Sequence, residues 1–139
     1  MPVRSASISL DTRGENDTHD LTGHVRQAVA QSGLSDGTIT VFVPGSTAGV
    51  TTLEFEPGVV ADLGELFEAI APRQKLYRHE EAWHDGNGHS HVRAALLGPS
   101  LTIPFTGGEL LLGTWQQVVL VDFDNRSRRR KVHFQIVGE

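Results

Sequence analysis

Apolar and polar residues alternate in several short stretches of the chain, as they do in strands that are buried on one face. The clearest stretch is 129–137, where Val132, Phe134 and Ile136 share one face. Similar patterns predict strands at 3–10, 37–44, 50–55, 101–105 and 115–124. Gly107-Gly108 adds a hairpin signal after the fourth of these stretches.

Two stretches have the spacing of helices instead. Apolar residues recur at helical intervals between Leu21 and Val29, with Thr18 or Asp20 as a cap and Gly33 as a stop. A broader apolar stripe covers 57–72, where a proline opens the helix and a second proline ends it. Residues 77–90 read as an irregular segment, and the pattern of 91–97 fits a short helix or a strand.

The 139 residues have the length of one domain and show no linker or internal repeat, so residues 1–139 are expected to form a single unit. About seven strands and two main helices predict an α+β fold with a β-rich, sandwich-like core. Mean hydropathy is −0.21, and no apolar run is long enough to span a membrane or to act as a signal peptide.

Charge and cysteine content exclude further classes of protein. The net charge is −5, which argues against a general nucleic-acid binder. The chain has no cysteine, so disulfides, thiolate metal sites and cysteine nucleophiles are absent. A cytoplasmic location is the expectation that agrees with this composition.

The most conspicuous chemistry is a group of histidines. Four of the seven, at positions 79, 84, 89 and 91, fall within thirteen positions. On an extended backbone His89 and His91 project to the same side, and His79 would complete a three-imidazole metal site. Zn²⁺, Ni²⁺, Fe²⁺ and Cu²⁺ all suit such ligands, and the alternative is a solvated loop. Asp85 would be a ligand, an acceptor for an imidazole N–H, or only the start of the following turn.

Two segments could bind an anion. The run from Arg126 to Lys131 holds five of the twelve Lys and Arg residues. It forms either a solvated hairpin end or a phosphate site, in which guanidinium groups grip the oxygens. The turn at 45–49 offers the hydroxyls of Ser46 and Thr47, and it is equally explained as a plain strand connection.

Several motifs taken together resemble one known family. They are V-F-V-P-G-S-T-A-G-V-T-T-L-E at 41–54, Y-R-H at 77–79, D-G-N-G-H-S-H-V-R-A-A-L-L-G at 85–98 and L-G-T-W-Q-Q at 112–117. On these motifs the chain resembles the YjbQ-like family, often labelled secondary thiamine-phosphate synthase. The resemblance implies a compact α+β domain with a β-sandwich core, assembled as a homotrimer.

The resemblance also implies a function. It suggests a weak transferase that joins hydroxymethylpyrimidine diphosphate to thiazole phosphate, at a histidine-lined metal or anion site. Carried onto this chain, that site involves His79, His91 and Glu54, with Arg128 and Arg129 matching the basic hairpin. The metal is expected to be divalent, zinc in the first instance, and the partner a phosphorylated small molecule.

One position departs from the family pattern. Many members have a histidine where this chain has Gly45, and His89 is expected to replace that ligand. Two other functions stay open: a hydrolase whose metal-bound water is assisted by Glu54 as base, and a trimer that binds a metal or ligand without turnover. Catalytic roles are thus expected for Glu54, His79 and Asp85, metal ligation for His79, His89 and His91, and anion binding for Ser46, Thr47, Arg128 and Arg129.

Overall fold

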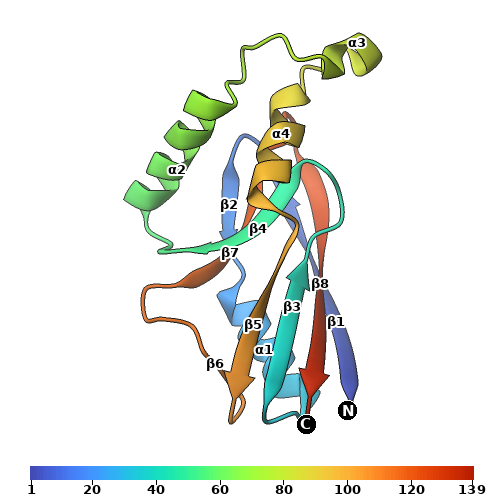
Figure 1. Cartoon of the computed structure of the whole chain (residues 1–139), viewed down its shortest axis with the longest axis vertical. Coiled ribbons are helices and arrows are strands. Elements are labelled where there is room, and N and C mark those ends of the chain that lie inside the picture. The colour runs from blue at the N-terminus through green and yellow to red at the C-terminus, as the bar shows by residue number, and fades with distance from the viewer.

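The computed structural model describes all residues 1–139 and contains eight strands and four helices (Figure 1). The elements are β1 (Val3–Thr12), β2 (Asp17–Asp20), α1 (Thr22–Ser32), β3 (Gly37–Phe42), β4 (Ala48–Leu53), α2 (Pro57–Ile70), α3 (His79–Trp83), α4 (Gly88–Leu97), β5 (Ser100–Thr106), β6 (Glu109–Leu110), β7 (Gln117–Asp122) and β8 (Arg128–Gly138). The α+β prediction is therefore confirmed.

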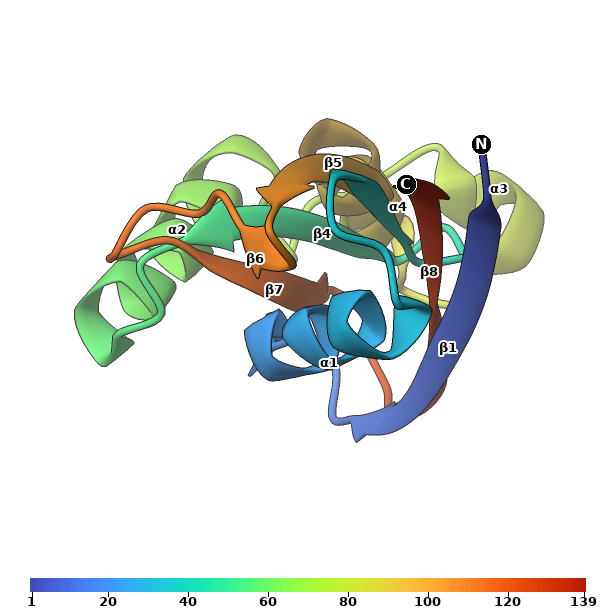
Figure 2. The same ribbon diagram turned by 90° about the horizontal axis from the view of Figure 1, so that it is seen from below.

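The strands form two antiparallel sheets. Five strands follow the order β1-β8-β3-β5-β6, and three follow the order β2-β7-β4. The sheets curl around α1, which lies in the angle between them (Figure 2). Inward-facing residues of β8, such as Val132, Phe134 and Ile136, are buried against this helix and the neighbouring strands. The alternation in the sequence thus identified the inner face of the larger sheet correctly.

A second, smaller core lies on the other side of β7. Val119, Val121 and Phe123 pack there against Phe67 of α2 and Ala94 of α4. The rings of Phe67 and Phe123 meet edge to face, with centroids 4.8 Å apart. Because both faces of β7 are covered, its sequence is a continuous apolar run rather than an alternating one.

The two expected helices are present, but the N-cap residue of α1 is Leu21 and not the expected Thr18 or Asp20. Gly33 ends α1 in the left-handed conformation, with φ of 73°. Pro57 occupies the first turn of α2, and the Glu56 side chain accepts hydrogen bonds from the amides of Gly58 and Val59. No helix in the structure combines the length and the apolar character needed to cross a membrane.

The main differences from the sequence prediction lie between residues 77 and 97. Residues 77–90, which were expected to be irregular, contain α3 and the first residues of α4. Residues 91–97, which fitted a helix or a strand, continue α4. α3 lies at one end of the molecule, beyond the ends of the strands, and α4 runs from there back alongside β4 (Figure 1). Trp115, at the start of the strand expected over 115–124, is 74% exposed, and β7 begins two residues later.

Candidate functional site

The candidate site lies where α3 meets the start of α4. The Asn87 side chain holds this junction: its carbonyl oxygen accepts hydrogen bonds from the Ser90 hydroxyl and from the amide of Asn125. Asn125 in turn donates its side-chain amide to the carbonyl of Asp85 at 2.7 Å. The turn before α4 is thus fixed to the turn that follows β7.

Gly88 allows a close approach that no other residue would permit. A Cβ atom at this position would lie 2.5 Å from Cβ of Tyr77. The Tyr77 hydroxyl donates to the carbonyl of Pro72 at 2.7 Å, which fixes the segment between α2 and α3. The absence of a side chain at position 88 therefore lets α3 and α4 share one small site.

Two of the predicted histidines come together there. The rings of His79 and His91 have centroids 4.4 Å apart and planes inclined by 37°. His79 Nδ1 is buried, makes no hydrogen bond, and lies 3.4 Å from Oδ1 of Asp85. Burial lowers the pKa of His91, and the neighbouring His79 lowers it further, so His91 favours its neutral form.

Glu80 joins this group, although no sequence pattern singled it out. Ligand atoms from His79, Glu80 and Asp85 all lie within 4.8 Å of one another. One Glu80 oxygen accepts a hydrogen bond from the amide of Gly86 at 3.0 Å, and this contact orients the carboxylate. We refer to His79, Glu80 and Asp85 as the α3 cluster.

His89 does not lie with the other two histidines. The expectation that His89 and His91 share a side assumed an extended backbone and is wrong, because both lie on α4. Residues two apart on a helix point about 200° from each other. His89 is 1% exposed and contacts the Ser90 hydroxyl at 3.3 Å. Burial lowers its pKa, as do Arg93 and Arg73, so His89 is an interior, neutral side chain.

Most of the residues predicted to bind an anion already have partners inside the chain. Arg128 donates to Asp124 at 2.9 Å, and Arg129 donates to Asp11 at 3.2 Å. The Thr47 hydroxyl is buried and donates to Asp124 at 2.8 Å. Burial alone would raise the pKa of Asp124, but the bonds from Thr47 and Arg128 outweigh it and hold the pKa below its ordinary value.

The same network includes two buried charges, Arg130 of the basic run and Asp122, which the sequence did not single out. Arg130 is buried and binds both carboxylate oxygens of Asp122, which is fully buried. It also donates to the Thr47 hydroxyl at 2.7 Å. The basic run therefore anchors its own hairpin to the sheet. Ser46 is exposed and lines a small cavity together with His91.

Glu54 lies apart from the α3 cluster. It is exposed, it follows β4, and it precedes the start of α2, whereas α3 lies beyond the other end of that helix (Figure 1). The structure thus gives no support for pairing Glu54 with the histidines within one chain.

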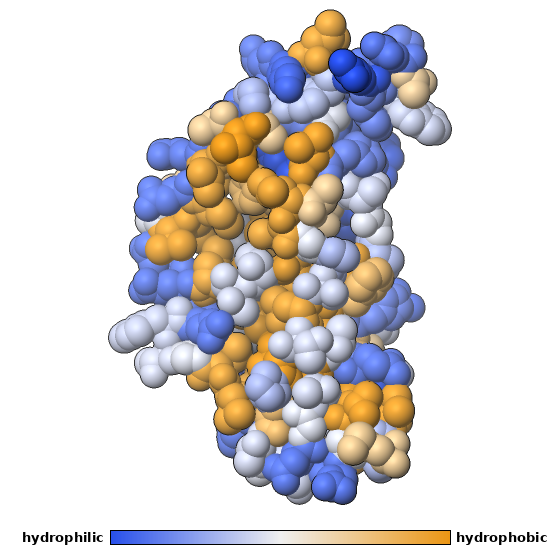
Figure 3. Space-filling model, in the orientation of Figure 1, coloured by the Kyte–Doolittle hydropathy of each residue, from blue (hydrophilic) through white to orange (hydrophobic).

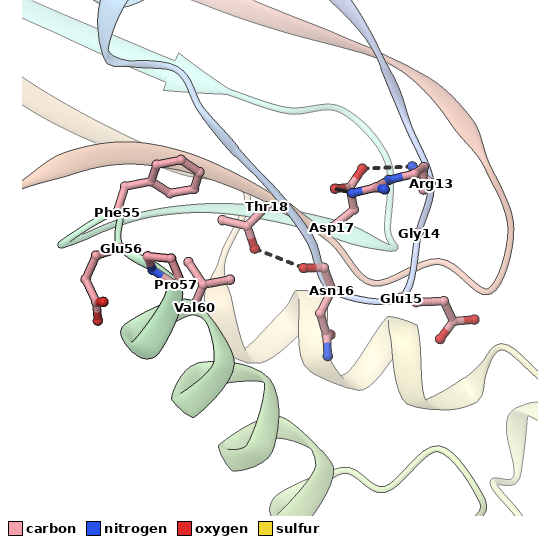
Figure 4. Close-up of a pocket in the computed structure, with 10 residues that line it drawn as sticks. All are labelled: Arg13, Gly14, Glu15, Asn16, Asp17, Thr18, Phe55, Glu56, Pro57 and Val60. Atoms are coloured by element: carbon pink, nitrogen blue, oxygen red, sulfur yellow. Dashed lines mark hydrogen bonds and ion pairs between the residues drawn. The ribbon is translucent and has the colours of Figure 1, made fainter.

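The residues next to Glu54 line a separate cavity of about 570 Å³ between the β1–β2 turn and the start of α2 (Figure 4). Its polar groups are already paired: Asp17 accepts from Arg13, Asn16 accepts from Arg93, and Glu56 caps α2. We therefore assign no ligand to this cavity.

A third cavity, of about 550 Å³, adjoins the α3 cluster. It is lined by Lys75, Leu76, Tyr77, Arg78, His79, Gly88, His91 and Val92. Cationic, imidazole and apolar groups thus meet in one hollow. We refer to it as the His79–His91 cavity.

Comparison with known proteins places the chain among close relatives. Residues 6–139 match the family described as UPF0047 protein YjbQ-like. A UPF0047 protein of Mycobacterium tuberculosis is 41% identical over 118 residues, covering 85% of this chain and 86% of the relative. A UPF0047 protein of Archaeoglobus fulgidus is 33% identical over 125 residues, covering 90% of this chain and 95% of the relative.

Solved structures agree with the fold. A YbjQ-like protein of unknown function from Sulfolobus solfataricus superposes with a TM-score of 0.94 at 30% identity, covering 99% of each chain. An uncharacterized YjbQ/UPF0047 protein from Clostridium acetobutylicum superposes with a TM-score of 0.86 at 38% identity. That match covers 95% of this chain and 99% of the other.

These comparisons correct the predicted activity. The family and the relatives that match are named only as UPF0047 proteins, and the Sulfolobus protein is described as having no known function. The prediction of a metal-dependent enzyme with thiamine-phosphate synthase activity is therefore wrong, since nothing in the family supports it. What the matches do show, over nearly the whole chain, is that it belongs to the YjbQ-like UPF0047 family.

Proposed function

We propose that the α3 cluster binds a divalent cation, with zinc as the ion that suits it best. The observation that supports the proposal is the convergence of one imidazole nitrogen and two carboxylates within 4.8 Å, with the imidazole nitrogen buried and lacking a hydrogen bond. A buried polar atom without a partner is uncommon and costs free energy unless something binds it. The proposal concerns binding and assigns no reaction to the site.

The donor atoms fit zinc in kind and in spacing. Zinc accepts imidazole nitrogen and carboxylate oxygen at about 2.0–2.2 Å, which places neighbouring ligand atoms of a tetrahedron roughly 3.4 Å apart. Nδ1 of His79 and Oδ1 of Asp85 are 3.4 Å apart. Three protein ligands would leave a fourth position open toward the His79–His91 cavity. The alternative is that this contact between His79 and Asp85 holds no cation, and zinc stoichiometry distinguishes the two.

The test is zinc stoichiometry in untagged protein that has been stripped with a chelator and then reloaded. We expect about one zinc per chain in the wild type and a loss of binding in both His79→Ala and Asp85→Asn. His133→Ala is the matched control, because His133 is exposed on β8, away from α3. A wild type that retains no zinc, or a variant pair that binds as the wild type does, would refute the proposal.

We also propose that the chain assembles as a homotrimer. α2 supports this, because Phe67 is the only residue of this apolar helix that is buried. Leu66 and Ile70 of α2 are each 53% exposed, and Val92 and Leu96 of α4 are exposed as well. Together with residues around β5 they form a broad apolar band on one face (Figure 3). Apolar areas of this kind are typical of interfaces between subunits.

Light scattering tests the assembly. The wild type is expected at three times the chain mass of 15.1 kDa, and Leu66→Asp with Ile70→Asp is expected to shift it toward one chain. Gln27→Asp with Gln31→Asp introduces the same charge on exposed positions of α1 and is expected to change nothing. A monomeric wild type would contradict the proposal.

A cytoplasmic location remains a prediction from the composition.

A further inference from the structure

β1 has a long strand edge that no other part of the chain covers. It is the first strand in the order β1-β8-β3-β5-β6, and no other element runs along its outer edge (Figures 1 and 2). The other terminal strands are shorter or covered: β6 has two residues, β2 has four, and β4 packs against α4. β1 has ten residues, which pair with β8 in one continuous register. An open edge of this length can pair with a further strand.

The backbone of β1 directs alternate residues toward this open edge. In an antiparallel pair, the N–H and C=O of one residue point to the same side, and the next residue points to the opposite side. The Pro2 carbonyl accepts a hydrogen bond from the amide of Gly138, so Pro2 and the even-numbered residues of β1 face β8. The odd-numbered residues therefore direct their N–H and C=O groups outward, and the central three are Ser5, Ser7 and Ser9.

These three serines are complementary to the same segment of a second copy. When two β1 strands run antiparallel with Ser7 opposite its counterpart, Ser5 of each chain lies opposite Ser9 of the other. All three pairs then join outward-facing residues, and two hydrogen bonds for each pair give about six in all. A register shifted by one residue would place each outward-facing residue opposite one that faces β8. Backbone geometry thus fixes which residues can face each other across the edge.

The side chains of β1 favour the same antiparallel arrangement. Arg4 and Asp11 are the only charged residues of the strand, and this register places Arg4 of one chain one position from Asp11 of the other. A parallel pair in register would instead place like charges side by side, which destabilises a sheet. On the inner face, Ala6 and Ile8 are only half-buried within one chain, and they would lie opposite each other in the pair. Pairing would therefore remove more of both side chains from water.

From this edge we infer that two copies of the chain associate by antiparallel pairing of their β1 strands, centred on Ser7. The larger sheet then continues from one chain into the other. The contact is separate from the apolar band proposed for the trimer, because β1 and β5 lie toward opposite ends of the five-strand order. It depends neither on the trimer nor on a bound cation. Few apolar side chains take part, so the association is weak and requires concentrated protein.

Amide hydrogen exchange, measured by NMR in dilute protein at about 50 µM and in concentrated protein at about 1 mM, tests this pairing. We expect the amides of Ser5, Ser7 and Ser9 to exchange at least about threefold more slowly in the concentrated protein. Ala6 and Ile8 provide the internal control. Their amides face β8 and should be protected to the same extent at both concentrations.

Ser7→Asp tests the centre of the contact, since it would place two carboxylates directly opposite each other. We expect it to abolish the slower exchange in concentrated protein. Thr38→Asp is the matched control, because Thr38 is exposed on β3, which is paired on both sides, and it should behave as the wild type does. Slower exchange that persists in Ser7→Asp, or wild-type exchange of the three serine amides that does not depend on concentration, would overturn the inference. The wild-type comparison decides the outcome even if Ser7→Asp fails to fold.

Discussion

The His79 and His91 rings lie with their centroids 4.4 Å apart and their planes inclined by 37°, although the two residues belong to different helices. The contact depends on the sharp approach of α3 to α4, and this approach depends on the turn at residues 85–88. Nδ1 of His79 is buried and makes no hydrogen bond, and it lies 3.4 Å from Oδ1 of Asp85. Local backbone geometry thus creates the site, and the surrounding charges determine what it can bind.

Gly88→Ala tests this dependence. The new Cβ would lie 2.5 Å from Cβ of Tyr77, so the two segments must move apart. We expect a loss of about 1–3 kcal/mol in the free energy of unfolding, measured by urea denaturation, together with weaker zinc binding. Gly23→Ala is the control, since a Cβ there meets nothing within 4 Å. Equal stability and zinc affinity in the wild type and Gly88→Ala would show that the close approach is unimportant.

Arg93 is expected to be the main tie between α4 and its neighbours. Its side chain is 4% exposed, and its guanidinium donates to the carbonyl of Ala71 and to the side chain of Asn16, each at 3.0 Å. Arg93→Met should lower the free energy of unfolding by about 2–4 kcal/mol, because these buried acceptors would lose their donor. Arg93→Lys should lower the free energy of unfolding almost as much as Arg93→Met, since an ammonium group cannot reach both acceptors in the same plane.

Arg129→Met provides the comparison for Arg93. Its ion pair with Asp11 joins two exposed side chains, so its removal should change stability by less than about 1 kcal/mol. Similar urea midpoints for the variants at positions 93 and 129 would contradict the role assigned to Arg93.

Acid should destabilise the protein through Asp124. Its pKa is lower in the folded chain than in the unfolded chain, where carboxyl groups of aspartate titrate near about 3.9. Between the two pKa values the unfolded state therefore binds more protons than the folded state. The free energy of unfolding consequently decreases as the pH is lowered. The contribution of Asp124 is complete above the unfolded pKa and is lost as pH falls through the folded pKa. Urea midpoints between pH 6 and pH 3 should fall more steeply in the wild type than in Asp124→Asn. A slope that Asp124→Asn leaves unchanged would rule this contribution out.

The sequence predicted regular elements well where burial is one-sided. Residues 129–137 alternate because β8 has one buried face. Gly33 ends α1 because the backbone there takes the left-handed conformation, which glycine adopts most easily. Residues 77–97 were difficult for the opposite reason. The pattern of 91–97 fitted a helix and a strand equally, and the pairing of His89 with His91 assumed an extended backbone. Contacts of Ser90 and Ala94 with the region around Phe123 stabilise a helix instead.

The candidate site was predicted only in part. His79, His91 and Asp85 were identified because their residue types suit metals. Which side chains lie next to them depends on whether the backbone is helical, and this could not be read from the sequence. Spacing alone placed His89 with them, and it missed Glu80. Likewise, the arginines at 128 and 129 suggested a phosphate site because the carboxylates that bind them, Asp124 and Asp11, lie in other strands or turns and are not evident from the local sequence.

The most direct test of the central claim is long-range ¹H–¹⁵N NMR of the imidazole nitrogens during zinc titration. We expect one equivalent of zinc to shift the Nδ1 resonance of His79 strongly and to leave the resonances of His89 and the exposed His133 unchanged. Resonances of His79 that stay unchanged at saturating zinc, or a shift centred on His89, would contradict a cation site formed by His79, Glu80 and Asp85.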